Sequence, residues 1–213
     1  MFIMNGSIVK ASVSRDPQIV ERRILDAAQM EFELHGFEGA STNRIARRLQ
    51  GSKSTLFRYF GTKEEMLEAV VTRIAGQWHD QVNSDSISQS SPEAWLNEFA
   101  RRTLKWILGK GPLFVGRLAI SEGHKFPELE RVFQETAGDP LKDLVAKQLR
   151  KWTQSGLLEC RDPRGDAERF LDLIVSGVVS RRLYGQRPDS QTKLNAHVTR
   201  GVDLFLHGCA DPS

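Results

Sequence analysis

Residues 41–63 read STNRIARRLQGSKSTLFRYFGTK, and the fold follows most directly from this stretch. It contains no acidic residue, and its basic residues are Arg44, Arg47, Arg48, Lys53, Arg58 and Lys63. Gln50-Gly51-Ser52 separates two short helical patterns, because glycine favours a turn and serine is a common N-cap. Two short helices with a tight turn and a positive outer face predict a helix-turn-helix, whose second helix can enter the major groove of DNA.

Each of these short helices has an apolar stripe. The stripes consist of Ile45, Ala46 and Leu49 in the first helix and of Leu56, Tyr59 and Phe60 in the second. An ordinary helix pair with a solvated basic face is the alternative interpretation. The combination of charge, turn and the small Ala46 favours the helix-turn-helix.

Helical signals recur along almost the whole chain, whereas no segment alternates like a β-strand. Asp16-Pro17 predicts a helix start, and Gly36 predicts its end after His35. The serine-rich residues 84–91 are expected to form a loop. Further helices are expected over about 42–49, 53–60, 62–83, 92–108, 112–123, 127–137, 139–155, 166–184 and 190–207. The sequence therefore predicts an all-α protein with about nine to ten helices.

The charge is unevenly distributed, with a basic N-terminal part and a nearly neutral remainder. The chain has 213 residues and a net charge of +3, but residues 1–63 carry ten Lys or Arg against six Asp or Glu. Such asymmetry is typical of a nucleic-acid reader attached to another domain. Cys160 and Cys209 form neither a metal spacing nor a disulfide framework, which fits a reducing compartment. Without a signal-peptide pattern or an apolar run of roughly 20 residues, we expect a cytoplasmic protein that does not enter a membrane.

The residues that carry a family resemblance extend over about residues 17–68. They are Ile24-Leu25, Ala27-Ala28, Phe32, Gly36-Phe37, Thr42, Ile45-Ala46, Ser52-Lys53, Thr55-Leu56-Phe57, Tyr59-Phe60, Lys63-Glu64 and Leu67. In this pattern the chain resembles the TetR family of one-component transcriptional regulators, and residues 122–184 are similar to a C-terminal domain of many of them. The resemblance implies a flexible N-terminal arm (1–15), a three-helix DNA-binding domain (16–63) and a helical domain for ligand binding and dimerisation (64–213).

Two residues depart from the family pattern. The family usually has glycine where this chain has Gln50, and Gly51 follows one position later. Either Gln50 adopts a left-handed backbone, at a cost of about 1–2 kcal/mol, or the turn shifts by one residue. The family's usual tyrosine is Phe57 here, so one hydroxyl that commonly contacts phosphate is absent.

The expected DNA interface comprises Thr42, Arg44, Ser52, Lys53, Ser54, Thr55, Phe57, Arg58, Tyr59 and Lys63. The resemblance implies phosphate contacts for Thr42, Tyr59 and Lys63. A helix N-terminus at Thr42 also favours an anion. Phosphate contacts position a protein on DNA, and base contacts make it specific.

Base contacts are expected from the exposed side of the second helix, namely from Lys53, Ser54, Thr55 and Arg58. Arg58 can bind a guanine edge with two hydrogen bonds, or it can simply contact a phosphate. Arg44 is expected to supply electrostatic attraction or a surface salt bridge.

Residues 170–183, FLDLIVSGVVSRRL, are apolar over more than one face of a predicted helix. So wide an apolar arc needs cover from two sides. With the resemblance, this pattern predicts a four-helix dimer interface of Leu171, Ile174, Val175, Val178, Val179, Leu194, Val198, Val202 and Phe205. The alternative is a monomer core with the last helix packed over the previous one. We favour the dimer because helix-turn-helix proteins commonly bind two half-sites by twofold symmetry.

Aromatic residues suggest a ligand cavity, since such cavities are mostly apolar. The candidates are Trp78, Trp95, Phe99, Trp106, Phe114, Leu118 and Ile174, with Arg117 and His124 as nearby polar groups. The alternative is solid core, which is the usual role of an aromatic stripe at helical spacing. The histidines have no metal-ligand spacing, so neither a metal nor another cofactor is expected.

These patterns predict a ligand-responsive, dimeric repressor that a small, largely apolar molecule releases from a pseudo-palindromic operator on double-stranded DNA. One alternative is a DNA-bound adaptor whose C-terminal body binds another protein. The other is an enzyme on a helical scaffold, although the sequence contains no phosphate loop, zinc motif or nucleophile elbow.

Overall fold

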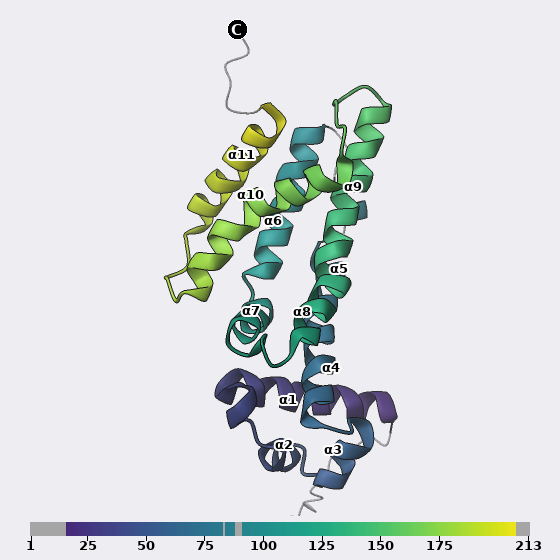
Figure 1. The fold of residues 1–213 in the computed structure, drawn as a ribbon, viewed down its shortest axis with the longest axis vertical. Coiled ribbons are helices and arrows are strands. Elements are labelled where there is room, and N and C mark those ends of the chain that lie inside the picture. Colours follow the sequence, from purple (N-terminus) through teal and green to yellow (C-terminus); the bar gives the residue numbers. More distant parts are fainter. Residues whose placement is uncertain (1–15, 83, 88–90, 208–213) are drawn as a thin grey trace, which may run out of the picture. The chain divides into compact units, whose positions relative to one another are not determined.

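The computed structural model describes residues 16–82, 84–87 and 91–207, and every regular element in these ranges is a helix (Figure 1). The helices are α1 (Pro17–Gly39), α2 (Thr42–Arg48), α3 (Lys53–Tyr59), α4 (Lys63–Gly76), α5 (Trp78–Gln81), α6 (Pro92–Ile107), α7 (Lys110–Glu122), α8 (Pro127–Phe133), α9 (Asp139–Gln154), α10 (Pro163–Leu183) and α11 (Gln191–His207). A 3₁₀ turn covers Ser84–Ser86, and a π-helical turn covers Gln134–Gly138. The expected all-α fold is confirmed. The arm expected over residues 1–15 and Cys209 lie outside the described residues.

The chain forms two compact units, which divide within α4 between Leu67 and Glu68. The boundary expected after residue 63 lies one helical turn earlier. The first turn of α4 belongs with the N-terminal unit because Lys63 Nζ donates to the Phe37 carbonyl at 2.9 Å. Leu67 is also buried.

Local signals explain where the helices of the N-terminal unit begin and end. The Asp16 side chain accepts a hydrogen bond from the Gln18 N–H at 3.0 Å, and Pro17 occupies the first turn of α1. Gly36 has φ 66° and ψ −178°, which interrupts the helical path of α1 where the sequence predicts a stop. The core of this unit includes the fully buried Ile24, Phe32, Ile45 and Leu56.

In the C-terminal unit, α10 packs against α9 and α11, and α11 also packs against α6 (Figure 1). Aromatic side chains fill the centre of this unit. The rings of Trp95 and Phe99 on α6 stack with their centroids 4.9 Å apart. Trp152 of α9 meets Trp95 edge-on at 5.6 Å. The core therefore joins residues that are distant in sequence.

The segment between α8 and α9 differs from the expectation. The sequence predicts a new helix at Asp139-Pro140, but the helical backbone continues from α8 through the π turn into α9. Pro140 has no N–H for the carbonyl of Thr136, four residues earlier. Trp78 replaces that donor, because its Nε1 donates to the Thr136 carbonyl at 2.7 Å. The helix that the sequence predicts over 62–83 is interrupted at Gln77, between α4 and α5.

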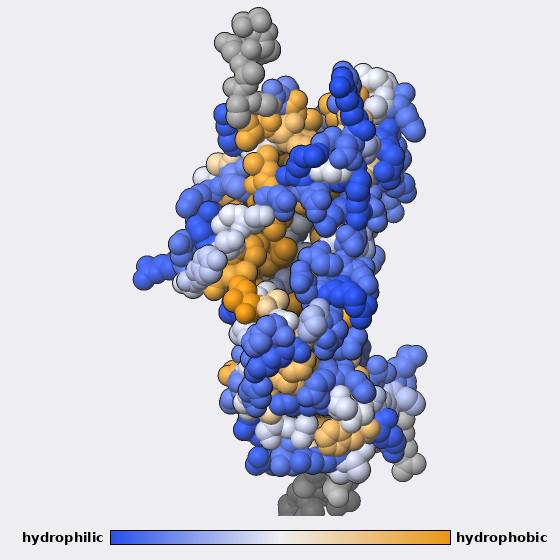
Figure 2. Space-filling view, in the orientation of Figure 1, coloured by the Kyte–Doolittle hydropathy of each residue, from blue (hydrophilic) through white to orange (hydrophobic). Residues whose placement is uncertain are grey.

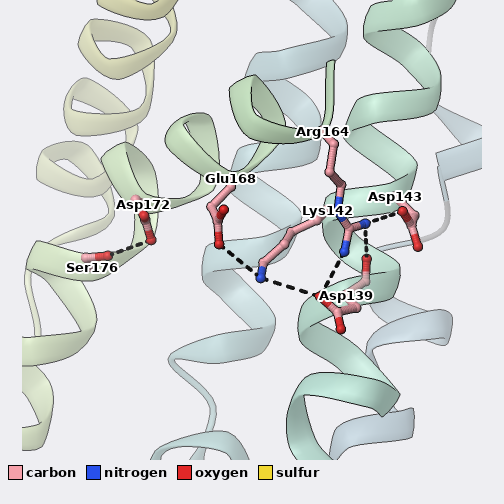
Figure 3. Close-up of polar contacts among 7 residues, drawn as sticks. All are labelled: Asp139, Lys142, Asp143, Arg164, Glu168, Asp172 and Ser176. Carbon is pink, nitrogen blue, oxygen red and sulfur yellow. Dashed lines mark hydrogen bonds and ion pairs between the residues drawn. The ribbon is translucent and has the colours of Figure 1, made fainter. Parts of the chain in front are cut away.

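Ion pairs join the start of α9 to α10 (Figure 3). Lys142 Nζ lies 3.5 Å from the Asp139 carboxylate and 3.2 Å from the Glu168 carboxylate. Arg164 pairs with Asp139 at 2.9 Å and also with Asp143. Each pair is partly exposed and contributes about 0–1 kcal/mol, so the network mainly fixes how α9 and α10 align.

Candidate functional site

The turn between α2 and α3 is built around Gln50. Its φ of 53° makes it the one non-glycine residue with a positive φ in the part of the chain that the structure describes. The Gln50 N–H donates to the Arg47 carbonyl at 3.1 Å, and the Gly51 N–H donates to the Ala46 carbonyl at 3.0 Å. These two bonds form a Schellman motif, which closes α2 and sets the direction of α3. Gln50 itself therefore adopts the left-handed conformation, and the turn is not shifted to Gly51.

Helix α3 is capped at one end and anchored on one side. Ser52 Oγ accepts a hydrogen bond from the Thr55 N–H at 3.2 Å and lies 2.6 Å from Ser54 Oγ. Leu56 is fully buried and holds α3 to its unit. The helix therefore presents its remaining side chains on a defined surface, with the Ser52 hydroxyl used for capping.

The exposed side of α3 carries most of the candidate base-reading residues. Lys53, Ser54, Phe57 and Arg58 are exposed, whereas Thr55 and Tyr59 are half-buried. The Arg58 guanidinium carbon lies 5.6 Å from the centroid of the Tyr59 ring, within the range of a cation–π contact. Phe57 is 41% exposed. An apolar ring therefore lies at the surface where the family that the chain resembles usually has a tyrosine hydroxyl that contacts phosphate.

A groove of about 430 Å³ runs beside α3 within the N-terminal unit. Arg23 of α1 and Arg58 of α3 both line it, together with Gln50 and Tyr59. Arg23 therefore extends the basic surface beyond the helix-turn-helix itself. Sequence reasoning missed this residue because it lies outside the basic stretch, two turns into α1.

The most connected polar group of this unit is the Glu31 carboxylate of α1. Glu31 is fully buried, and its Oε1 accepts hydrogen bonds from Arg44 Nε at 2.5 Å and from the Ser41 N–H at 3.1 Å. The Arg44 Nη2 also donates to the Gly39 carbonyl at 2.5 Å. Arg44 thus ties α2 to α1, which matches the salt bridge that the sequence offered as one of its roles.

Two opposing effects act on the pKa of Glu31. Burial raises it, but the hydrogen bond from the Ser41 N–H and the bond and charge of Arg44 outweigh burial, with a smaller contribution from His35. The pKa of Glu31 therefore lies below its ordinary value, and the carboxylate is charged at neutral pH. In the sequence, Glu31 is an acidic residue on an otherwise apolar helix face that includes Ala28 and Phe32. This pattern could have indicated a buried carboxylate.

Two of the expected phosphate contacts lie at helix starts. Thr42 is the first residue of α2 and is half-buried. Lys63 is the first residue of α4, and besides its bond to the Phe37 carbonyl its Nζ lies 4.2 Å from the centroid of the Phe37 ring. Lys63 therefore already closes the end of α1, and any phosphate contact would add to this role.

The structure places the residues expected around a ligand cavity in two settings. Seven of its candidates, Trp78, Trp95, Phe99, Trp106, Phe114, Leu118 and Ile174, are buried against other side chains. Arg117 and His124 are exposed. None of these nine residues lines any of the described pockets. Trp95, Phe99 and Trp106 share one buried cluster with Trp152 of α9 and Ile174 of α10, so in this structure they pack as core side chains.

The expected dimer residues divide into two groups. Ile174, Val178, Val198 and Val202 are at most 1% exposed, because they pack into the core of their own unit. They present no surface to a partner, which corrects their assignment to an interface. Leu171, Val175, Val179, Leu194 and Phe205 are half-buried and remain at the surface. The helical periodicity of the sequence did not show which apolar residues of α10 face the core and which face the surface.

Neither a metal cluster nor a membrane span is found in the described ranges. No group of three or more His, Cys, Asp or Glu side chains there is placed to hold a metal ion. No helix there is both long and apolar enough to cross a membrane.

Two family models match the chain. The model described as bacterial regulatory proteins of the tetR family matches residues 24–70. The model described as the C-terminal domain of AefR-like transcriptional repressors matches residues 94–208, which is more than half of the chain. The two matches cover the helix-turn-helix and most of the C-terminal unit.

Individual proteins give the same picture. The HTH-type transcriptional repressor SCO4008 of Streptomyces coelicolor is 31% identical over 84 residues, 39% of this chain and 42% of that relative, so the match spans less than half of it. The structure of a TetR-family regulator from Mesorhizobium loti has a TM-score of 0.82 at 25% identity and covers 91% of this chain and 97% of that one. The flavonoid-responsive regulator FrrA shares the fold, with a TM-score of 0.74 at 24% identity over 91% of this chain and 98% of that one.

Proposed function

The chain belongs to the TetR family of bacterial transcriptional regulators, and we propose that it is a dimeric repressor that a small molecule releases from its operator. In this proposal residues 16–63 bind DNA, and residues 64–213 dimerise and bind the effector in the bacterial cytosol. Two similar proteins support it: the relative SCO4008 is a transcriptional repressor, and the structural neighbour FrrA is a flavonoid-responsive regulator.

The exposed surface of α3 carries the proposal. Lys53, Ser54 and Arg58 project from a helix whose start is fixed by the Ser52 cap and whose direction is fixed by the turn at Gln50. No acidic residue occurs between residues 39 and 63, so nothing within this stretch opposes the approach of a phosphate backbone.

We propose base contacts for two charged side chains on the exposed side of α3 and phosphate contacts for two hydroxyl-bearing side chains. Arg58 and Lys53 read base edges in the major groove, since arginine and lysine both suit the acceptors of guanine. Tyr59 and Thr42 bind phosphates, and Arg44 positions α2 through Glu31 instead of contacting a base. This division gives base contacts to α3 and backbone contacts to its flanks.

The dimer is proposed to form through the outward faces of α10 and α11. Besides the half-buried apolar residues named above, Leu173 is 36% and Tyr184 is 79% exposed on or next to α10. Figure 2 shows apolar residues gathered on the visible surface around α10 and α11. A second copy of the same two helices would cover this surface with twofold symmetry.

A footprinting experiment on the DNA upstream of the protein's own gene tests the proposal. We expect protection of a pseudo-palindromic site whose half-sites lie about one helical turn, or a multiple of it, apart. Protection without symmetry would argue against the dimer. The absence of any protected site there or elsewhere in the genome would favour the adaptor or enzyme alternatives.

A further inference from the structure

A cleft of about 360 Å³ lies in the C-terminal unit between α7, α8 and α10. Small-molecule sites occupy about 300–1,000 Å³, so the cleft suits a compact ligand. Its walls are mainly apolar and include Val115, Ala119, Ile120, Leu129 and Phe133. Ile120 is 64% exposed, which leaves the cleft open to solvent.

The polar groups of the cleft favour one sign of charge. Glu130 is the only charged residue in its lining, and Gln134 adds an amide. Glu130 makes no ion pair with any residue that the structure describes. Nearby bases are already engaged, since Arg131 pairs with Glu135 at 2.9 Å and Lys125 with Glu122 at 3.2 Å.

An aromatic ring from the same helix also lines the cleft. Phe133 lines the cleft and stacks on Trp106, with their ring centroids 6.1 Å apart and their planes 10° from parallel. The buried Trp106 therefore holds the Phe133 ring in place. A carboxylate and a fixed aromatic ring in one cleft each attract a cation, and apolar walls accept a hydrocarbon body.

We propose that this cleft is the effector site and that it takes an apolar molecule with a cationic head group. That the bound molecule regulates DNA binding rests on the proposed function. That such a molecule binds in the cleft does not. Val179 of α10 lines the cleft and also lies on the proposed dimer surface, so the cleft borders that surface. A second copy of the chain is the less suitable occupant of the cleft itself, because the Glu130 carboxylate would be left without a partner in an interface core.

Occupancy can act on the rest of the chain through the π turn. Phe133 ends α8 and Gln134 begins the π turn, whose Thr136 carbonyl is bonded to Trp78 of α5. Helix α5 follows α4 after one residue, and α4 carries the chain into the N-terminal unit. In this proposal a ligand that shifts Phe133 or Gln134 would act on the hydrogen bond between Trp78 and the Thr136 carbonyl.

Calorimetry on the whole protein without DNA tests the site with three probes that share one apolar body: phenylbutylamine, phenylbutyrate and phenylbutanol. We expect the amine to bind about tenfold more tightly than the carboxylate, with the alcohol between them, because Glu130 attracts one and repels the other. Glu130→Gln should remove this preference. Glu128→Gln makes the same change on α8 outside the cleft and should preserve it.

A blocking variant locates the site. Ala119→Phe places a ring in the cleft from α7 and should abolish binding of all three probes, while thermal melting shows that the protein remains folded. The inference is overturned if no probe binds up to about 1 mM, the weakest affinity of interest. It is also overturned if the amine preference survives in Glu130→Gln, or if Ala119→Phe changes only the oligomeric state.

DNA binding is measured separately on the unliganded protein. If the amine binds as expected but the protein shows no specific DNA binding, the cleft stands and the proposed function fails. If the protein binds its operator but the probes do not bind in the cleft, the proposed function stands and this inference fails.

Discussion

At the scale of single residues, Gln50 holds the helix-turn-helix together in a conformation that glycine adopts more easily. Its φ of 53° places a side chain in the left-handed region, and that side chain is exposed. Gln50→Gly should relieve the strain and stabilise the N-terminal unit by about 0.5–1 kcal/mol, the gain being reduced by the greater freedom of glycine in the unfolded chain. Urea unfolding measures the change.

Gly51 provides the control for that substitution. Gly51 lies outside the left-handed region, and a Cβ there would meet nothing closer than the Leu49 Cβ at 3.9 Å. Gly51→Ala should therefore be neutral or slightly stabilising. If Gln50→Gly destabilises the protein while Gly51→Ala does not, the strain argument is wrong.

Glu31 makes the stability of the N-terminal unit depend on pH. Its carboxylate is buried and bonded to Arg44 and the Ser41 N–H, and its pKa lies below the ordinary value. The stabilisation is therefore fully present above the ordinary pKa and is lost as the pH falls through the folded-state pKa. Glu31→Gln should lower stability by about 2 kcal/mol at neutral pH, the value of a charge-assisted hydrogen bond.

The difference between wild type and Glu31→Gln should shrink as the pH falls from about 5 to about 3 in urea unfolding, because the wild-type carboxylate becomes protonated. Glu33→Gln makes the same charge change on the same helix at a half-buried position and serves as the control. A pH-independent difference would mean that Glu31 acts through packing alone.

At the scale of elements, the helix that runs from α8 through the π turn into α9 depends on a side chain from another helix. Trp78 donates to the carbonyl that Pro140 cannot serve. Trp78→Phe keeps an aromatic ring but leaves the Thr136 carbonyl unpaired. Trp106→Phe is the matched control, since the Trp106 Nε1 has no hydrogen-bond partner among the described residues.

Trp78→Phe should therefore be more destabilising than Trp106→Phe by about 1–3 kcal/mol, the cost of a buried unsatisfied carbonyl. Thermal or urea unfolding of both variants gives the comparison. Adding Pro140→Ala should recover part of the loss, because alanine restores a backbone N–H to that turn. Equal losses for the two tryptophan variants would show that the bond to Thr136 contributes little.

Much of the local structure was predictable because its causes are local. Asp16-Pro17 and Ser52 start helices through their own side chains, and Gly36 interrupts α1 through its own backbone. The sequence also left open whether Gln50 would adopt the left-handed conformation, and the Schellman bonds answer that question. The π turn was not predictable, because its donor Trp78 lies 58 residues before Thr136.

The candidate sites show the same limit. The polar face of α3 follows from residues within one helix, so its exposed side chains were predictable. The role of Phe99 was not, because periodicity places it on a face with Trp95 but does not reveal that Trp152 of α9 covers that face. The cleft at Glu130 was missed because its walls come from three separate helices.

At the scale of the whole molecule, the proposed dimer depends on which face of α10 points outward. Val178 lies in the core of its own unit, whereas Val175 is half-buried at the surface. Val175→Asp should dissociate the dimer and keep the helical content, because the charge enters only the intersubunit contact. Val178→Asp should instead unfold the C-terminal unit.

Sedimentation and circular dichroism at micromolar concentration separate these outcomes. A Val175→Asp variant that stays dimeric and folded would place the interface elsewhere. A Val178→Asp variant that is folded but monomeric would restore Val178 to the interface and contradict its burial.

The most direct test of the account compares the affinity of the protein for its upstream DNA with its affinity for random duplex of equal length, at several salt concentrations. Specific binding should exceed non-specific binding by about 10³-fold or more, and its logarithm should fall with the logarithm of salt. Arg58→Ala should lose about 1–3 kcal/mol on the specific site alone, whereas Tyr59→Phe should weaken both DNAs about equally. Equal affinity for both DNAs in the wild type, with no effect of salt, would contradict sequence-specific DNA binding by α3.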